Sequence, residues 1–217
     1  MARLIIVRHA ESALNVANRI QGHQDSQLTE KGRSQARRLA RRIRHFHIDR
    51  IYSSDLGRAY STTCEITRHL KGVKIIRDPK LREILLGDWE GKSPAEVDKL
   101  YNKGYQKWLR KPSAMRIPKA EPTGRFRLRV TSRVREIARA NHGKTVLVVT
   151  HGGVITALLA DWLEADFDRV LRGMQIENTR LTFVDLTEKK ARLWVISDTD
   201  HLAKKDKNDE RFIRRRS

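Results

Sequence analysis

The chain has 217 residues, of which 39% are hydrophobic and 33% are charged, a composition typical of one globular domain rather than of a disordered segment. Its apolar runs are too short to cross a bilayer, and the apolar stretch before Arg8 is too short for a signal peptide. The chain has a single cysteine, Cys64, which excludes an internal disulfide. These features predict a cytoplasmic protein with no membrane partner.

The formal net charge of +20 arises from 46 Lys and Arg against 26 Asp and Glu. A surface of this kind either attracts phosphate esters, nucleic acids or acidic membranes, or is solvated without a dedicated partner. The basic residues are spread along the chain, with short runs at 37–38, 41–42 and 214–216, and no RNA-binding aromatic motif or zinc-finger spacing is found. We therefore favour the solvated surface and expect no specific nucleic-acid partner.

Strands and helices are predicted to alternate along the chain. In order, we expect a strand at 4–7, a helix at 29–46, a strand at 50–53, a helix at 55–70, a strand at 73–76, a helix at 93–108, a loop at 111–124, a helix at 128–138, a strand at 145–150, a helix at 154–163, and strands at 181–186 and 193–196. This order predicts an α/β protein with a mainly parallel central sheet covered on both faces. The absence of repeats and linkers predicts one domain over 1–203, followed by a basic, mobile tail over 204–217.

Two histidines follow predicted parallel strands directly. His9 comes after the strand at 4–7, and His151 comes after the strand at 145–150. Ligands bind at the carboxyl edge of such sheets. Arg8 beside the first histidine, and Arg58 at the start of a helix, would bring positive charge to the same edge. Cations and helix N-termini that converge there predict a site for an anion, with phosphate as the obvious ligand.

Motifs along nearly the whole chain resemble the histidine phosphatase (phosphoglycerate mutase-like) superfamily. In the family's order, they are Arg8-His9-Ala10-Glu11-Ser12 with Asn15, Gln21-Gly22, 28–32 with Gln35-Ala36, 53–59, Leu81-Arg82-Glu83, 87–91, 149–153 and 198–202. The resemblance implies a three-layer α/β/α sandwich of the phosphoglycerate mutase-like type.

The resemblance also implies a mechanism in which His9 attacks phosphorus and forms a phosphohistidine. The remaining site residues that it implies are the general acid Glu83, the catalytic His151 and a substrate-binding set of Arg8, Asn15, Gln21, Gly22, Arg58 and the backbone N–H of Gly152. Because these donors and cations can stabilise the charge of the phosphoryl group, no metal and no cofactor is required. The expected partner is a small phosphorylated molecule, and a homodimer is left open.

The residues that follow Glu83 bear on the choice between phosphatase and mutase. The mutase branch places Arg-His-Tyr-Gly there, polar groups that grip a sugar acid, followed by a longer insertion. This chain has Ile84-Leu85-Leu86-Gly87 and a short segment up to Pro118. We therefore predict a phosphomonoesterase that transfers the phosphoryl group to water. The alternatives are a cofactor-dependent phosphoglycerate mutase and, less favoured, a noncatalytic basic binding protein on the same fold.

Where many relatives carry Gly-Glu-Ser, this chain departs from the family pattern with Gly124-Arg125-Phe126. We place these residues at the pocket rim. Together with Arg116, Arg127 and Arg129, they suggest a strongly anionic or aromatic substrate. The remaining predictions are surface or structural roles for His23, His45, His47, His69, His142 and His201, core or pocket-wall positions for Trp89, Trp108 and Trp162, and a loop-supporting role for Glu11.

Overall fold

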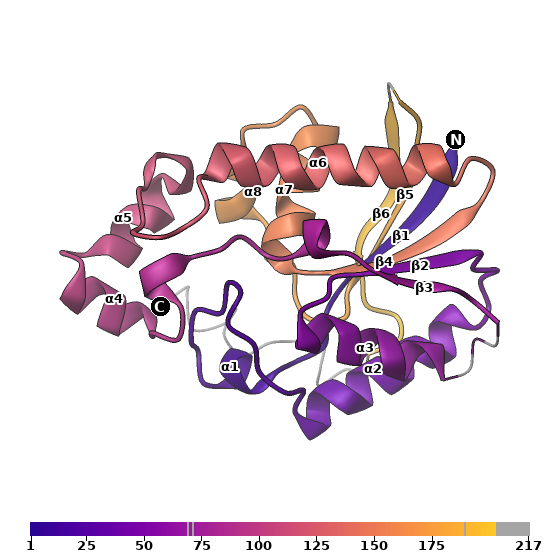
Figure 1. Cartoon of the computed structure of the whole chain (residues 1–217), viewed down its shortest axis with the longest axis horizontal. Helices are drawn as coiled ribbons and strands as arrows, with labels where there is room; N and C mark the ends of the chain where they lie inside the picture. Colours follow the sequence, from indigo (N-terminus) through magenta and orange to yellow (C-terminus); the bar gives the residue numbers. More distant parts are fainter. Residues whose placement is uncertain (69, 71, 189, 203–217) are drawn as a thin grey trace.

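The computed structural model describes residues 1–68, 70, 72–188 and 190–202, and these form a six-stranded sheet between two layers of helices (Figure 1). The strands lie in the order β3 (Ile75–Arg77), β2 (Arg50–Ser53), β4 (Thr145–Thr150), β1 (Ala2–Arg8), β5 (Leu181–Leu186) and β6 (Ala191–Asp198). The first four of these are mutually parallel; β5 pairs antiparallel with β1, and β6 pairs antiparallel with β5 and therefore runs in the direction of β1. The predicted three-layer, mainly parallel α/β/α architecture is confirmed.

Different helices cover the two faces of the sheet (Figure 1). One face packs against α2 (Glu30–Ile43) and α3 (Gly57–Thr67); the other packs against α6 (Thr123–Ala140) and α7 (Gly152–Trp162), with α8 (Phe167–Gly173) beside α7. Successive residues of β1 alternate between the two cores: Leu4 faces α6 and α7, whereas Ile5 faces α2 and α3. Both faces of the strand are therefore buried, which is why its sequence is continuously apolar rather than alternating.

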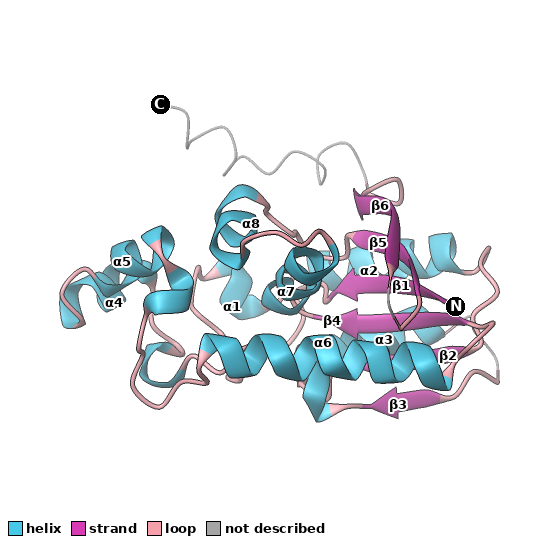
Figure 2. Ribbon diagram, turned by 90° about the horizontal axis from the view of Figure 1, so that it is seen from above, coloured by secondary structure: helices cyan, strands magenta, loops and turns pink. Residues whose placement is uncertain are grey.

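The register of β1 and β4 brings the two predicted histidines together. Arg8 pairs with Thr150, and the next residues, His9 and His151, leave the sheet at the same edge. The backbone N–H of His9 still donates to the carbonyl oxygen of Thr150, at 2.8 Å. In Figure 2 the arrows of β1 and β4 point toward the side of the molecule that carries α1 (Ala13–Val16), α4 (Pro94–Leu100) and α5 (Gly104–Arg110).

Helix boundaries differ from the predictions at several places. The helix expected at 93–108 is two helices, α4 and α5, because Asn102 and Lys103 adopt positive φ angles of 48° and 58° that end the first one. The predicted start of that helix is confirmed, since the Ser93 hydroxyl accepts from the Glu96 N–H in a capping box. Helix α6 begins five residues earlier than residue 128, and the short helices α1 and α8 were not predicted.

Short 3-10 turns occupy three segments near this edge of the sheet, at Pro79–Leu81, Gly87–Trp89 and Pro112–Ala114. The first two flank Glu83, and they hold the chain in a fixed path between β3 and α4. The third lies within the predicted loop at 111–124. These irregular segments, rather than long helices, form the approach to the candidate site.

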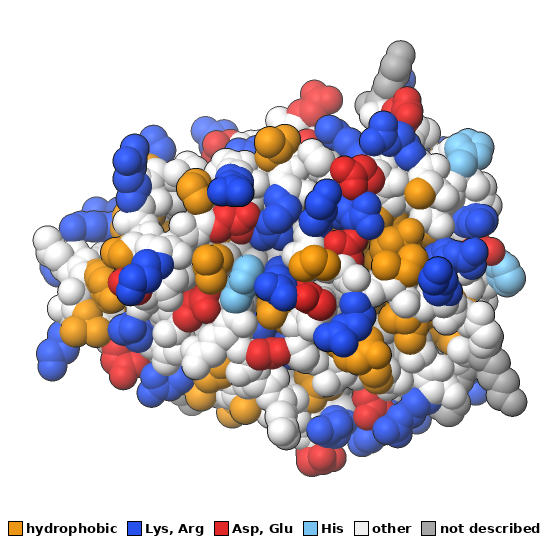
Figure 3. Space-filling model, in the orientation of Figure 1, with side chains coloured by type: hydrophobic (Ala, Val, Ile, Leu, Met, Phe, Trp, Pro, Cys, Tyr) orange, Lys and Arg blue, Asp and Glu red, His pale blue; other side chains and the backbone are white. Residues whose placement is uncertain are grey.

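Two predictions fall outside the described residues: the basic tail at 204–217 and the role of His69. The domain boundary at 203 therefore stays a prediction. None of the described helices combines the length and the apolar character that a bilayer crossing requires. In Figure 3 Lys and Arg side chains are scattered over the visible face among acidic and apolar ones, in line with the dispersed charge of the sequence.

Candidate active site

One cavity of about 270 Å³ at the carboxyl edge of the sheet collects most of the predicted site residues. Its lining includes Arg8, His9, Asn15, Gln21, Gly22, Arg58 and Glu83. These residues come from the end of β1, the 12–22 loop, the start of α3 and the segment after Leu81. His151 lies directly behind His9, with the centres of the two imidazole rings 5.2 Å apart and their planes tilted by 60°.

The hydrogen bonds of His9 determine which ring nitrogen can react. Its Nδ1 lies 2.8 Å from the carbonyl oxygen of Ala10, and a carbonyl can only accept, so Nδ1 carries the proton. In the neutral ring, the Nε2 lone pair is then available to attack an electrophile. Burial, followed by the positive charges of Arg58 and Arg8, holds the pKa of His9 well below its usual value. The imidazole is therefore neutral at neutral pH.

The backbone of His9 is held from both sides. Its carbonyl oxygen accepts from the side-chain amide of Asn178 at 2.8 Å, and the N–H of Ala10 donates to the Thr62 hydroxyl at 2.9 Å. The imidazole is only 3% exposed. These contacts leave the ring little freedom to rotate, which is what an in-line attack on phosphorus requires.

His151 is fully buried and also neutral. Burial is the main cause of its lowered pKa, and the nearby charge of Arg58 acts in the same direction. Its Nε2 lies 2.8 Å from the hydroxyl of Ser54, at the end of β2, while its Nδ1 has no hydrogen-bond partner among the described residues. One ring nitrogen thus remains available for a ligand that enters beside His9.

Arg58 is the most deeply buried cation of the cavity, with 1% of its surface exposed. Its Nη2 donates to the carbonyl of Gly22 at 2.7 Å, and its Nη1 to the carbonyl of Gln24 at 2.9 Å and to Asp25 at 3.2 Å. Its Nε is buried without a partner in the described part of the chain. Among the described residues, Asp25 is the carboxylate within ion-pair distance of this guanidinium, while Glu83 and Glu90 act on it from farther away. The unpaired Nε of Arg58 can still donate to an anion.

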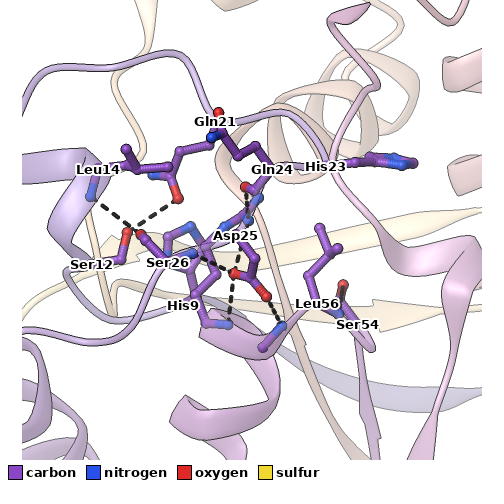
Figure 4. Close-up of polar contacts among 12 residues, drawn as sticks. His9, Ser12, Leu14, Gln21, His23, Gln24, Asp25, Ser26, Ser54 and Leu56 are labelled. Atoms are coloured by element: carbon purple, nitrogen blue, oxygen red, sulfur yellow. Dashed lines mark hydrogen bonds and ion pairs between the residues drawn. The ribbon is translucent and has the colours of Figure 1, made fainter. Parts of the chain in front are cut away.

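Asp25 links the loop over the cavity to the start of α3. Its carboxylate accepts from the backbone N–H groups of Gly57 and Arg58, the latter at 3.1 Å, as the dashed lines of Figure 4 show. A carboxylate at a helix N-terminus offsets the partial positive charge there. Asp25 therefore fixes Arg58 through both its backbone and its side chain, a role that the sequence did not reveal.

Asn15 and Gln21 present amide groups to the cavity. The Oδ1 of Asn15 accepts from the backbone N–H of Ser12 at 3.1 Å and from the amide of Asn178 at 3.4 Å. The Oε1 of Gln21 accepts from the Ser12 hydroxyl at 3.1 Å. Since both side-chain oxygens are used internally, each residue directs its donor nitrogen to a ligand.

The carboxylate of Glu83 reaches the cavity across the N-terminus of α7. It accepts from the backbone N–H of Gly153 at 2.9 Å and from its own neighbour Ile84 at 3.0 Å. A Cβ at position 153 would come within 2.3 Å of this carboxylate, so only glycine allows the approach. Each carboxylate oxygen retains a lone pair that can bind a proton.

The main chain at Glu83 is fastened by two side chains from elsewhere. Its carbonyl oxygen is 2.9 Å from Nε2 of His23 and 3.3 Å from Nη2 of Arg129. Arg129 also donates to the carbonyls of Lys80 and Arg82, at 2.8 and 3.0 Å. It forms a two-point ion pair with Glu121 on its other edge. His23 and Arg129 thus position the predicted general acid without touching the cavity.

Glu90 joins the two loops that border the cavity. Its carboxylate accepts from the backbone N–H groups of His23 and Gln24 on one side and from that of Leu86 on the other, all at 2.8 to 2.9 Å. Gly22, with a φ of +51°, lies so close that a Cβ there would overlap the Glu90 side chain. The 21–25 loop is therefore tied to the segment that carries Glu83.

Apolar side chains form the wall of the cavity away from the histidines. They are Ile20, Ile84, Leu86, Trp89, Tyr105, Trp108, Pro112, Phe126, Phe167 and Leu171. They come from α5, α6, α8, two of the 3-10 turns and the loops at Ile20 and at 84–86. Tyr105 stacks on Trp108 with ring centres 5.7 Å apart. The cavity thus has a charged, hydrogen-bonding floor and an aromatic wall.

The family model for the histidine phosphatase superfamily (branch 1) matches residues 4–199. The chain belongs to the histidine phosphatase superfamily. Over 93% of its length it is 31% identical to phosphoserine phosphatase 1 of Hydrogenobacter thermophilus, and the match covers 95% of that protein. Over 72% of its length it is 35% identical to phosphoglycerate mutase-like protein 4 of Arabidopsis thaliana, and the match covers 69% of that protein. The solved structure of Bacillus stearothermophilus YhfR matches 93% of this chain and 99% of its own, with 32% identity and a TM-score of 0.88.

Some predicted positions of this histidine phosphatase superfamily member need correction. Phe126 is not at the rim: it is 1% exposed and lies in the cavity wall. Arg116, Arg125, Arg127 and Arg129 do not line the cavity. His23 is a structural residue, as predicted, but its contact with the Glu83 carbonyl gives it a specific place in the site. Gly152 lies at the start of α7 close to Arg8, and its expected contact with the phosphoryl group stays a prediction.

Three residues of the site were missed in the sequence: Asp25, Ser54 and Glu90. Ser54 and Glu90 occur inside motifs of the superfamily, at 53–59 and 87–91, which is the one signal that could have marked them. Asp25 belongs to no such motif. Within the described ranges, no group of three or more His, Cys, Asp and Glu side chains is arranged to hold a metal ion.

Proposed function

We propose that this chain is a phosphomonoesterase that hydrolyses small phosphate esters through a phosphohistidine on His9. The observation that carries the proposal is the state of His9: neutral, hydrogen-bonded through Nδ1 and open at Nε2, at the floor of a cavity with Arg8 and Arg58. The names of the relatives, a phosphoserine phosphatase among them, point to the same class of reaction.

In the first step, Nε2 of His9 attacks phosphorus, and the bond between phosphorus and the ester oxygen breaks. Glu83 gives its proton to that oxygen, so the alcohol leaves in neutral form. The charge on the transferring group is met by Arg8, Arg58 and the open nitrogen of His151. These groups can supply the stabilisation that a metal ion provides in other phosphatases, and we therefore propose a metal-independent reaction.

In the second step, water attacks the phosphorus of the phosphohistidine, and Glu83 removes a proton from that water. The bond from phosphorus to Nε2 breaks, inorganic phosphate leaves, and His9 and Glu83 return to their starting states. The same carboxyl serves both steps because the alcohol leaves from the side that the water later occupies.

Trapping of the phosphoenzyme tests the proposal. We expect p-nitrophenyl phosphate to be hydrolysed by the wild type with or without EDTA, and the acid-labile, base-stable label of a phosphohistidine to appear on the protein from radioactive substrate. His9→Ala should abolish turnover and label, whereas His47→Ala, on an exposed side chain, should change neither. Full turnover by His9→Ala, or no turnover by the wild type at any pH between about 4 and 8, would refute it.

A phosphoglycerate mutase is the second candidate, because several relatives carry names of that kind. A mutase must retain a charged sugar acid and exclude water while it turns over. Ile84 and Leu86, which follow Glu83, line the cavity and offer no ligand for a carboxylate. We therefore expect conversion of 3-phosphoglycerate to be negligible beside hydrolysis, even with a bisphosphoglycerate primer; substantial primed conversion would reverse this choice.

A further inference from the structure

The wall of the cavity differs from its floor in offering mostly apolar surface to the alcohol part of a substrate. Its polar groups, the hydroxyls of Thr123 and Tyr105 and the indole N–H groups, are uncharged, and its other side chains are aromatic or aliphatic. Trp89, Trp108 and Phe126 are among them. Phe126 and Trp89 are buried to 1% and 2% exposure, so these rings are fixed in the protein rather than exposed on a mobile surface. An apolar ligand would remove the accessible ring faces from water.

The arginines that line the cavity already lie at the phosphate end or have partners in the protein. Among the described residues that line the cavity, the only basic side chains besides His9 are Arg8, Arg19 and Arg58. Arg8 and Arg58 lie at the phosphate end. Arg19 donates to the carbonyl of Gly91 at 2.5 Å and to Glu96 at 3.1 Å, so a carboxylate would have to compete with that pair.

Two nearby arginines outside the lining, Arg127 and Arg129, also have partners in the protein. Arg129 is paired with Glu121 at 2.7 Å, and the guanidinium of Arg127 lies over the ring of Phe167 at 5.2 Å. The second contact is informative because it holds the charge against the outer side of a ring that belongs to the wall. Among the described residues, Arg19, Arg127 and Arg129 therefore each have a partner with which the carboxylate of a sugar acid or an amino acid would have to compete. Arg116 borders the neighbouring cavity beside Trp108 and does not line this one.

From this arrangement we propose that the substrates are phosphate esters of bulky apolar or aromatic alcohols without a carboxylate, rather than phosphoserine or phosphoglycerates. The inference rests on the proposed phosphatase function and names the substrate class of the same cavity. It departs from what the name of the phosphoserine phosphatase relative suggests. The ester's apolar group would lie against Trp108, Phe126 and Leu86, with the phosphoryl group at His9.

A set of four alkyl esters tests the proposal without a difference in leaving-group chemistry. Ethyl phosphate serves as the baseline, 2-phenylethyl phosphate adds an apolar ring, and 3-phosphoglycerate and O-phosphoserine add a carboxylate. We expect kcat/KM for the phenylethyl ester to exceed that of ethyl phosphate by about 20-fold, since burial of a ring against apolar walls is worth roughly that factor. The two carboxylated esters should be no better than ethyl phosphate.

Matched tryptophan variants locate the effect. Trp108→Ala should raise KM for 2-phenylethyl phosphate about tenfold more than KM for ethyl phosphate, because only the larger ester buries a ring against the indole. Trp194→Ala, on β6 outside the cavity and 51% exposed, should affect neither ester. If Trp108→Ala reduces turnover of both esters equally, the wall does not select the substrate and the proposal fails.

A binding experiment separates this proposal from the proposed catalysis. Titration calorimetry with ethylphosphonate, 2-phenylethylphosphonate and 2-carboxyethylphosphonate, none of which can be hydrolysed at its P–C bond, should show the phenylethyl compound binding the tightest. That order supports the substrate class even if no ester is turned over, an outcome that would refute the phosphatase function alone. Tightest binding of the carboxyethyl compound, lost in Arg19→Gln, would overturn the proposal and identify Arg19 as a carboxylate ligand.

Discussion

The floor and the wall of the cavity are built in different ways. The floor consists of charged and hydrogen-bonding side chains at the ends of β1 and β4 and at the start of α3, held by bonds to the backbone, to a carboxylate or to the Ser54 hydroxyl. The wall consists of apolar side chains from α5, α6, α8, two 3-10 turns and the loops at Ile20 and at 84–86. Most wall residues lie on other elements than the floor residues, so substitutions can be chosen that alter one region and leave the other in place.

The two regions also have opposite effects on the free energy of folding. Burial of the wall rings stabilises the folded chain. Burial of His9, His151 and Arg58 opposes folding, because each loses water and retains an open polar atom or an unfavourable neighbour. Variants of the floor should therefore cost activity on every ester, whereas variants of the wall should change the ranking of esters.

The largest effect is expected for Arg58→Met. Loss of a buried guanidinium beside the transferring phosphoryl group should lower kcat/KM by about 1000-fold for every ester, with their ratios unchanged. Steady-state kinetics on ethyl and 2-phenylethyl phosphate measures both quantities. Arg41→Met, at an exposed position of α2, is the matched control and should be silent. A change in the ratio of the two esters would mean that floor and wall are not separable.

Glu83→Gln should be the next most damaging variant. An amide cannot donate the proton of a carboxylic acid, so hydrolysis of ethyl phosphate should fall about 300-fold. p-Nitrophenyl phosphate needs little protonation of its leaving group, and it should give a burst of one equivalent of nitrophenolate followed by slow turnover. Stopped-flow absorbance measures the burst. Glu30→Gln, 87% exposed on α2, should behave as the wild type. Equal losses on both esters without a burst would assign Glu83 another role.

The buried histidines of the floor predict a specific loss of stability in mild acid. Because the folded pKa values of His9 and His151 are lowered, the unfolded chain takes up protons below about pH 6.5 and the folded chain does not. Stability present above that pH is therefore lost as the pH falls, by about 2.7 kcal/mol per pH unit for the two groups together. Asp55 and Asp185, whose pKa values are also lowered, contribute only at more acidic pH.

Urea unfolding between pH 6.5 and 5.5 measures this dependence. Because the unfolded histidines are only about half protonated at the upper end of this range, the wild type should lose about 2 kcal/mol over it and reach the limiting slope only at lower pH. His9→Gln should lose about half as much, roughly 1 kcal/mol, because one of the two proton-linked groups is gone. His47→Gln, whose side chain is 88% exposed, should leave the slope unchanged. A slope that His9→Gln does not reduce would show that the histidine is not held neutral in the folded chain.

The smallest effect on activity is expected for Arg129→Gln. Arg129 lies outside the cavity, and its loss should act on the floor through the position of Glu83. Loss of its bonds to the carbonyls of Lys80, Arg82 and Glu83 should displace the general acid and lower kcat about tenfold, with little change in KM. Arg129→Lys, which can keep one of these bonds, should recover part of the loss. Arg133→Gln, at the next turn of α6 and paired with Asp78, controls for a simple loss of stability. Equal effects of the two glutamine variants would make Arg129 a structural residue only.

The sequence predicted the floor better than the wall. The strands at 50–53, 145–150 and 181–186 match the structure, and the apolar run of β4 identified a strand covered on both faces. His9, Arg58 and Glu83 follow elements whose ends are marked by short motifs, so their meeting at one edge could be foreseen. Residues that follow adjacent parallel strands meet at the carboxyl edge of the sheet, however the strands are connected.

The wall could not be foreseen, because its residues are brought together by irregular connections. Trp108 reaches the cavity on α5, after the break at Asn102 and Lys103. Asparagine is enriched in left-handed backbone, but one Asn inside a helical pattern does not predict two consecutive residues with positive φ. Phe126 was placed at the rim because α6 was expected to begin after it. Asp25 stands in a loop without periodicity, and its contact with α3 depends on a tertiary approach that no local pattern encodes.

The register of β1 against β4 also limits where the protein can accept insertions. His9 and His151 occupy the first positions after paired residues, so a one-residue insertion in either strand would reverse the direction of one imidazole and destroy the pair. Insertions in the 111–118 connection would only reshape the wall. We therefore expect chimeras that exchange residues 104–118, which carry Tyr105, Trp108 and Pro112 of the wall, with those of a relative to change in substrate preference and to retain their own rate of phosphoryl transfer.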